Sequence, residues 1–171
     1  MTFYRFKKFM SMILSVAIHT CASAGFISPS MKFQIIQIPL MRHVLESFSV
    51  TSKPLLILAS NSPRRRQLLA LADWMFNVIV ADVDESMHQN ELPADYVLRL
   101  AETKARATAS RAHADQIILA ADTTVVDGSD ILGKPKDNVE AFAMLTRLRG
   151  HTHQVYTGVA LLRLSDGLLL K

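Results

Sequence analysis

Residues 60–66 combine two serines, a proline and three arginines, a set of side chains suited to binding phosphate. They follow the apolar residues 55–59, which have the composition of a buried strand, and Ser62 with Pro63 is typical of the first residues of a helix. A helix N-terminus attracts anions because its first N–H groups lack partners, and guanidinium groups add paired donors for phosphate oxygens. The residues therefore predict a site for a phosphorylated ligand, with a solvated arginine cluster as the competing interpretation.

Carboxylates follow two further apolar segments. Residues 82–85 come after the strand-like residues 76–80, and Asp122 ends the apolar run 117–121, where a charge without partners would be costly. Functional groups gather at the carboxyl ends of strands in an α/β sheet, so we expect carboxylates and arginines to share one crevice. Glu85 and Asp122 would supply hard oxygen ligands for Mg²⁺ or Mn²⁺, and one carboxylate would orient or deprotonate a water. For residues 82–85 the alternative is an ordinary acidic loop.

Two lysines and two histidines also have side chains that could take part in chemistry. Lys104 follows alanines on one predicted helix face, and Lys134 lies in a rigid Gly-Lys-Pro turn; solvated charge is the alternative for both. His151 and His153 alternate as on a strand, where exposed edge positions are expected in preference to a metal site. The chain contains neither a P-loop nor a dinucleotide-binding glycine motif, and its scattered aromatic residues give no stacking platform for single-stranded nucleic acid.

Strand-like and helix-like segments alternate after residue 53, which predicts an α/β fold: a mixed twisted sheet with helices on its faces. The long apolar strand 116–126 is expected in the centre of this sheet. Asp137, followed three residues later by Glu140, forms a capping-box pattern at the start of a helix. The predicted strands span residues 55–60, 76–80, 116–126, 131–133, 152–164 and 168–170. The predicted helices span about residues 63–72, 93–113 and 137–150, and the middle one would bury Val97, Leu100, Ala101, Ala105 and Ala109.

Positive charge is concentrated at the N-terminal end. The formal net charge is +4 and the isoelectric point is about 9.4, values that at first suggest nucleic-acid binding. Residues 53–171, however, carry 14 Lys and Arg against 14 Asp and Glu, so the whole excess lies in residues 1–52. A basic surface for nucleic acid is therefore not expected on the main domain.

Residues 1–52 form an N-terminal extension to a domain that we assign to residues 53–171. Basic residues precede the apolar stretch 9–18 and an Ala-x-Ala-like end, as in a secretory signal peptide, and the stretch is too short to span a bilayer. An organelle-targeting segment and a misassigned start are the alternatives. The one cysteine, Cys21, lies in this extension, so a disulfide framework within one chain is excluded.

Three motifs in order, Ser-Asn-Ser-Pro-Arg-Arg from Ser60, Ala-Asp-Thr from Ala121 and Gly-Lys-Pro from Gly133, resemble those of the Maf family of nucleoside triphosphate pyrophosphatases. The resemblance covers about residues 55–162. It implies a Maf/ITPase-like fold and hydrolysis of the bond between the α- and β-phosphates, which releases a nucleoside monophosphate and pyrophosphate. It also implies a divalent metal, a cytoplasmic location and a homodimer. The short apolar stretch 9–18 separately argues against stable membrane insertion.

The same resemblance implies roles for five charged residues. Asp122 would be the catalytic base or a metal-site carboxylate, and Glu85 would be a second acidic group at the metal. Arg65, Lys104 and Lys134 would contact the phosphates and the transition state. Cleavage of a phosphoanhydride develops negative charge on oxygens, so cations around the phosphates are expected to supply much of the catalysis.

Four further residues would bind the substrate. Ser60 and Ser62 would shape the turn around the phosphates. Arg64 and Thr123 resemble the branch of the family that acts on dTTP and UTP, since the branch that prefers 7-methyl-GTP has an aromatic residue at the first position and glutamine at the second. The resemblance therefore favours dTTP or UTP as the substrate.

The chain departs from the family pattern at its C-terminal end. Family members continue through an Asp-Lys-Ala-Gly segment and a glutamine that helps to select the base, and this chain ends before both. We therefore expect a domain that is incomplete at its C-terminal end, with impaired folding, dimerisation or activity. The alternative function is a non-catalytic nucleotide-binding protein or a regulator of septum formation.

Overall fold

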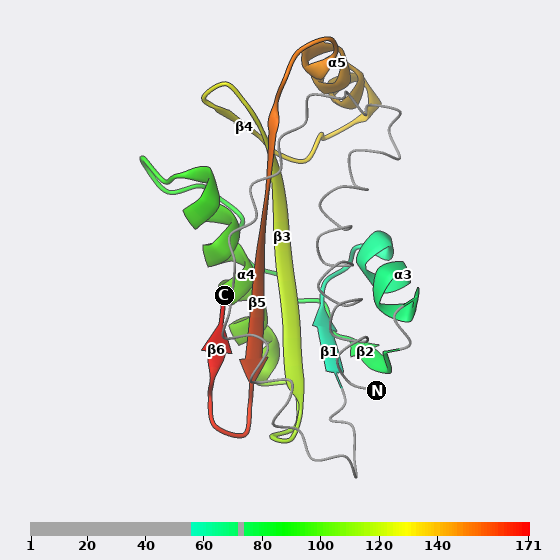
Figure 1. Cartoon of the computed structure of the whole chain (residues 1–171), viewed down its shortest axis with the longest axis vertical. Helices are drawn as coiled ribbons and strands as arrows, with labels where there is room; N and C mark the ends of the chain where they lie inside the picture. Colours follow the sequence, from blue (N-terminus) through cyan, green and yellow to red (C-terminus); the bar gives the residue numbers. More distant parts are fainter. Residues whose placement is uncertain (1–55, 72–73) are drawn as a thin grey trace.

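The computed structural model describes residues 56–71 and 74–171, and within them six strands form one mixed sheet (Figure 1). The strands lie in the order β2-β1-β3-β5-β6, and β4 pairs with β3 beside this path. They span Leu56–Ala59 (β1), Phe76–Val78 (β2), Ile117–Asp127 (β3), Asp130–Leu132 (β4), Gln154–Arg163 (β5) and Leu169–Leu170 (β6). The helices span Pro63–Leu71 (α3), Pro93–Ala109 (α4) and Asn138–Leu148 (α5). The predicted α/β fold is confirmed, whereas the predicted extension over residues 1–52 lies outside the described residues.

β3 lies in the centre of the sheet, as its apolar composition predicts. It runs parallel to β1 on one side and antiparallel to β5 on the other, and it pairs with β5 along almost its whole length. β1 is much shorter and ends at Ala59, which pairs with Ala120. Asp122 therefore lies just beyond the end of β1, where the loop that leads to α3 begins.

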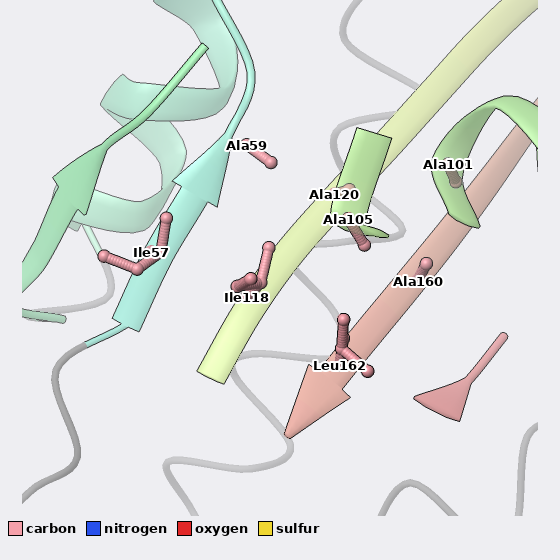
Figure 2. Packing of buried hydrophobic residues seen from close by; sticks show 8 residues of the cluster. All are labelled: Ile57, Ala59, Ala101, Ala105, Ile118, Ala120, Ala160 and Leu162. Atoms are coloured by element: carbon pink, nitrogen blue, oxygen red, sulfur yellow. The ribbon is translucent and has the colours of Figure 1, made fainter. Parts of the chain in front are cut away.

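Alternate residues of β1 and β3 pack on opposite faces of the sheet. On one face Ile57 and Ile118 lie in a cluster with alanines of α4 (Figure 2). On the other face Leu58 and Leu119 pack in a cluster with Leu69 of α3. The cluster beside α4 consists of Ile57, Ala59, Ala101, Ala105, Ile118, Ala120, Ala160 and Leu162. The two helices therefore cover opposite faces, as the predicted fold requires.

Small residues allow α4 to lie very close to the sheet. Ala101 and Ala105 are fully buried against β3 and against Ala160 of β5. At Gly158 of β5, an added Cβ would lie 2.4 Å from the carbonyl carbon and oxygen of Val97, so only glycine fits there. These contacts fix the distance between α4 and β3. They therefore also determine how close a side chain of α4 comes to β3.

α4 ends at Ala109, about one turn before the predicted end near His113. Arg111 N donates to the carbonyl oxygen of Thr108 at 3.0 Å, a tighter turn than the α-helical one. The side chain of Gln116 then accepts a hydrogen bond from His113 N at 2.8 Å. Because this side chain binds the backbone that enters β3, the chain leaves the helix earlier than its alanine-rich composition predicts.

β2 is also shorter than the predicted strand over residues 76–80. Ile79 N still donates to Leu58 O at 3.1 Å, but Val80 O accepts a hydrogen bond from the Arg111 guanidinium at 2.6 Å. At Val80 the backbone carbonyl thus binds the Arg111 side chain and not a neighbouring strand. None of the helices in the described ranges combines the length and the apolar character needed to cross a membrane.

α5 begins as the capping-box pattern predicts, but none of its residues is buried. Asp137 Oδ1 accepts a hydrogen bond from Glu140 N at 2.8 Å, and the Glu140 carboxylate accepts one from Lys136 N in place of the N-cap N–H. Phe142 is 73% exposed, and no residue of α5 is buried. The helix lies at the far end of the β3–β5 ribbon, away from β1 and β2 (Figure 1).

The close approach of α4 to β5 gives a prediction about stability. Gly158→Ala should lower the free energy of unfolding by about 1–3 kcal/mol, because the new methyl group must push α4 away from the sheet. Urea unfolding followed by circular dichroism measures the change. Gly133→Ala is the matched control, since a Cβ at Gly133 meets nothing within 4 Å. Equal midpoints for the two variants would contradict the packing described here.

Candidate active site

Lys104 of α4 lies between two carboxylates. Its Nζ donates to Asp122 Oδ1 at 2.5 Å and forms an ion pair with Glu85 Oε1 at 2.8 Å. The side chains of Lys104 and Asp122 are each 11% exposed. The sequence predicts all three residues as parts of the site, and the structure brings them together around one ammonium group.

The packing of α4 explains why a lysine can be buried there. Ala101 and Ala105 flank Lys104 along the helix and lie against the sheet, so the lysine side chain reaches β3 without bulky neighbours. A buried ammonium is strongly unfavourable unless an opposite charge and good hydrogen bonds compensate for lost water. Asp122 supplies that charge from the centre of β3. The burial of each residue therefore depends on the presence of the other.

Glu85 connects this buried pair to the surface. Its second oxygen, Oε2, accepts a hydrogen bond from Lys134 Nζ at 2.6 Å, and the Lys134 side chain is 81% exposed. Burial acts to raise the pKa of Glu85, but the hydrogen bonds from Lys104 and Lys134 outweigh it and lower the pKa below its ordinary value. Glu85 is therefore ionised at neutral pH, with one lysine on each oxygen.

Arg65 joins α3 to β3 at the edge of the same site. Its Nη1 donates to Ala121 O at 2.8 Å and to Ser60 Oγ at 3.1 Å, and its Nη2 donates to Thr123 Oγ1 at 3.1 Å. The Thr123 hydroxyl also lies 3.0 Å from the Thr157 hydroxyl on β5. Burial lowers the pKa of Arg65, and the charges of the nearby carboxylates Asp122 and Glu85 oppose that shift.

Arg65 thus lies beside the two predicted carboxylates, but Ser60, Ala121 and Thr123 already accept hydrogen bonds from its two terminal nitrogens. The expected phosphate contact would use the remaining donor capacity of the guanidinium, which has five N–H groups. In the structure Arg65 holds the start of α3 against the centre of β3. Its positive charge contributes to the electrostatics of the site at the same time.

The two serines form the turn between β1 and α3, as predicted. Ser60 Oγ accepts a hydrogen bond from Ser62 N at 3.2 Å, and Ser62 Oγ accepts a longer one from Arg65 N at 3.4 Å. Arg64 forms no hydrogen bond or ion pair with the cluster within the described residues, and its buried Nε has no hydrogen-bond partner there. The structure therefore brings together eight of the nine predicted site residues and leaves Arg64 apart from them.

Three residues that sequence analysis missed hold the loop that carries Glu85. Arg99 of α4 forms a two-armed ion pair with Glu91, with distances of 2.6 and 2.7 Å. Tyr96, one turn earlier on the helix, donates its hydroxyl to Glu85 O at 2.8 Å. Residues three apart share a helix face, so the Tyr-x-x-Arg spacing could have predicted a common target. The backbone acceptor itself has no sequence signal.

The predicted histidine pair lies elsewhere. His151 Nε2 lies 2.9 Å from Asp127 Oδ1, and Arg147 also binds Asp127 at 2.6 Å. His153 is partly buried, and its Nδ1 has no partner within the described ranges. These contacts fasten the end of α5 to β3, at a distance along the sheet from the Lys104 cluster.

Known proteins are similar to this chain in sequence. A family model described as Maf-like protein matches residues 55–168. The dTTP/UTP pyrophosphatase of Myxococcus xanthus is 60% identical over 107 residues, which are 63% of this chain and 54% of that relative. The dTTP/UTP pyrophosphatases of Bacillus cytotoxicus and Hahella chejuensis are 54% and 53% identical over 106 and 109 residues, which are 62% of this chain and 55% and 54% of those relatives. The chain therefore spans about half the length of the curated relatives it matches.

The ion pair between Arg99 and Glu91 predicts a specific acid sensitivity. Arg99 lowers the pKa of Glu91 from 4.5 to about 2, so the folded state binds this proton more weakly than the unfolded state does. The resulting stabilisation is complete above about pH 5 and disappears as the pH falls through about 2. The difference in unfolding free energy between the parent chain and Glu91→Gln should therefore shrink as the pH falls from about 5 to about 2.5.

Urea unfolding at a series of pH values measures this difference. Asp95→Asn is the matched control, because Asp95 is an exposed carboxylate in the first turn of the same helix. A difference for Glu91→Gln that stays constant across the acid range would contradict the assigned pKa.

Proposed function

This chain belongs to the family of Maf-like proteins, and we propose that it is a nucleoside triphosphate pyrophosphatase acting on dTTP or UTP. The products would be the nucleoside monophosphate and pyrophosphate. The names of its relatives support this substrate choice, since those in Myxococcus xanthus and Bacillus cytotoxicus are both dTTP/UTP pyrophosphatases. Residues 55–168, which match the family model, contain every residue to which we assign a role below.

One observation carries the proposal: a buried ammonium group lies between two carboxylates, and further cations lie around it. Lys104 contacts both Asp122 and Glu85, Lys134 contacts Glu85 from the surface, and Arg65 lies close enough for its pKa to respond to both carboxylates. A structural ion pair would need one cation and one anion. A cluster of three cations and two anions is instead suited to a polyanionic ligand and its counter-cation.

The cations would bind and orient the triphosphate. Lys134 is the most exposed of the three, so its ammonium can turn from Glu85 to a phosphate oxygen without leaving solvent. Lys104 and Arg65 are held in place by Asp122 and by the serine turn, and their charges would stabilise the negative charge that develops as the phosphoanhydride bond breaks. Preorganised charges of this kind need no rearrangement at the moment of reaction.

Glu85 and Asp122 would hold a divalent cation, Mg²⁺ or Mn²⁺. The donor set fits such an ion, because Mg²⁺ is usually bound by one or two carboxylates together with substrate phosphates and waters. Within the described ranges no group of three or more His, Cys, Asp and Glu could hold a metal, so the two carboxylates would share the ion with the nucleotide. When bound, the ion would neutralise phosphate charge and polarise water.

Asp122 would act on the attacking water. Its Oδ1 accepts a hydrogen bond from Lys104, which holds the carboxylate in one orientation at the centre of β3. The carboxylate would orient the water and accept its proton as the oxygen attacks phosphorus and pyrophosphate leaves. The Asp122–Lys104 contact would hold the base in place in a largely buried position.

We also propose a cytoplasmic location and a homodimer, as the resemblance to the family implies. The balanced charge of residues 53–171 supports a small-molecule substrate over nucleic acid as the partner. Nucleoside triphosphates and Mg²⁺ occur together in the cytoplasm, which supports that compartment for the reaction.

Asp122→Asn tests the proposed role of the carboxylate. The purified chain should release pyrophosphate from dTTP and UTP in the presence of Mg²⁺, and the substitution should lower kcat by about 10²–10⁴-fold because the base is removed. A colorimetric pyrophosphate assay against a panel of nucleoside triphosphates measures both the rate and the base preference. Asp115→Asn, at an exposed position before β3, is the control and should match the parent.

Two results would overturn parts of this account. An unchanged rate in Asp122→Asn would exclude the assigned base. Nucleotide binding by calorimetry without any turnover in the parent chain would instead favour the non-catalytic nucleotide-binding function.

A further inference from the structure

The loop that carries Glu85 is tied to the beginning of α4 at three points. Tyr96 donates its hydroxyl to Glu85 O at 2.8 Å, and Arg99 Nη2 donates to Ser86 O at 2.9 Å. Arg99 also forms the two-armed ion pair with Glu91 at the far end of the loop. The structure assigns no helix or strand to residues 79–92, so side chains of α4 fix this part of the chain.

Tyr96 and Arg99 form one unit on the helix surface. The Arg99 guanidinium lies 5.5 Å from the centre of the Tyr96 ring, which is within the range of a cation–π contact. Burial, and then the nearby charges of Asp122 and Glu85, raise the pKa of the Tyr96 hydroxyl. Tyr96 therefore remains protonated and able to donate its hydrogen bond across the neutral and mildly alkaline range.

We propose that Tyr96 and Arg99 are positioning residues that hold the Glu85 carboxylate against Lys104 and at the metal site. The inference rests on the proposed function for the role of Glu85. Both residues act through the backbone: they bind the carbonyl groups of Glu85 and Ser86, and neither touches the Glu85 carboxylate in the described contacts. With the main chain of Glu85 held in this way, its carboxylate would contact Lys104 and Lys134.

Lys104 lies on the same helix as Tyr96 and Arg99, so the three residues keep a fixed position relative to one another. Tyr96, Arg99 and Lys104 all belong to α4, so one rigid element holds both the main chain of Glu85 and one partner of its carboxylate. Gly158 sets the distance between α4 and the sheet that carries Asp122. The separation of the two carboxylates therefore depends on how α4 packs against the sheet, although Glu85 lies in a loop. Changes in a supporting shell of this kind commonly reduce metal affinity or activity by about 10–100-fold.

Tyr96→Phe and Arg99→Lys test the proposal in the full chain. Phenylalanine keeps the ring but loses the hydroxyl, and lysine keeps the charge but cannot form the two-armed pair with Glu91. Tyr156→Phe and Arg106→Lys are matched controls: the Tyr156 hydroxyl donates to Gln154 on an exposed part of β5, and Arg106 pairs with Glu102 on α4. Neither control residue contacts the loop that carries Glu85 in the described contacts.

The first readout is hydrogen–deuterium exchange of a peptide that covers residues 84–92. Ser86 N and His88 N are bonded within this loop to Asp84 and Glu91, so both amides are partly protected while the loop is held. Both test variants should exchange faster in this peptide and nowhere else, and the controls should match the parent. Unchanged exchange, or faster exchange over the whole chain, would overturn the positioning role.

The second readout is the concentration of Mn²⁺ needed for half-saturation, measured by electron paramagnetic resonance and, separately, by pyrophosphate release. We expect this concentration to rise about 10–100-fold in both test variants. The rate of pyrophosphate release at saturating Mn²⁺ should stay the same, because Asp122 is unaltered. An unchanged Mn²⁺ requirement would overturn the inference. The exchange and Mn²⁺-binding measurements do not require turnover, so an inactive parent chain would count against the proposed function and leave this test decisive.

Discussion

A buried ion pair between Lys104 and Asp122 is the interaction on which the rest of the site depends. A lysine and an aspartate lie together beneath α4, and the burial of either charge would be strongly unfavourable without an opposite charge beside it. The pair also reaches outward, because the same ammonium group contacts Glu85 and so links the centre of the sheet to an acidic loop. Stability and chemistry therefore share one set of contacts, and the charges that would act on a triphosphate are already in place before it binds.

The architecture places this pair just beyond the end of β1. β1 ends beside Ala120, two residues before Asp122. From that point β3 still pairs with β5 but no longer has β1 on its other side. The serine turn and Arg65 fill the start of that opening, and α4 covers the face above it at a height set by its alanines and by Gly158. The result is a polar site at the edge of an apolar core, supported by elements on both faces of the sheet.

Much of this arrangement could be predicted from the sequence, and the exceptions have physical causes. The alternation of strands and helices, the central strand and the buried face of α4 all follow from apolar periodicity, and the cap at Asp137 follows from its spacing to Glu140. The end of α4 was predicted too late, because the Gln116 side chain binds a backbone N–H, a contact that periodicity does not encode. The motifs named the charged residues of the site, but not Tyr96 and Arg99, since their targets are carbonyl groups that every residue carries. Sequence likewise could not reveal that the nitrogens of Arg65 are already occupied by protein acceptors.

The most direct test is a double-mutant cycle on the unfolding free energy, with Lys104→Met, Asp122→Leu and the two substitutions combined. Lys104→Met leaves the Asp122 carboxylate without its partner in a buried place and should cost about 3–5 kcal/mol. Asp122→Leu should cost less, because Lys104 keeps its ion pair with Glu85. The combined variant removes both charges, and Glu85 retains Lys134, so its loss should be far smaller than the sum of the two. Urea unfolding of the four proteins gives the coupling energy. Losses that simply add would show that Lys104 and Asp122 are independent, and would contradict the central role assigned to their contact.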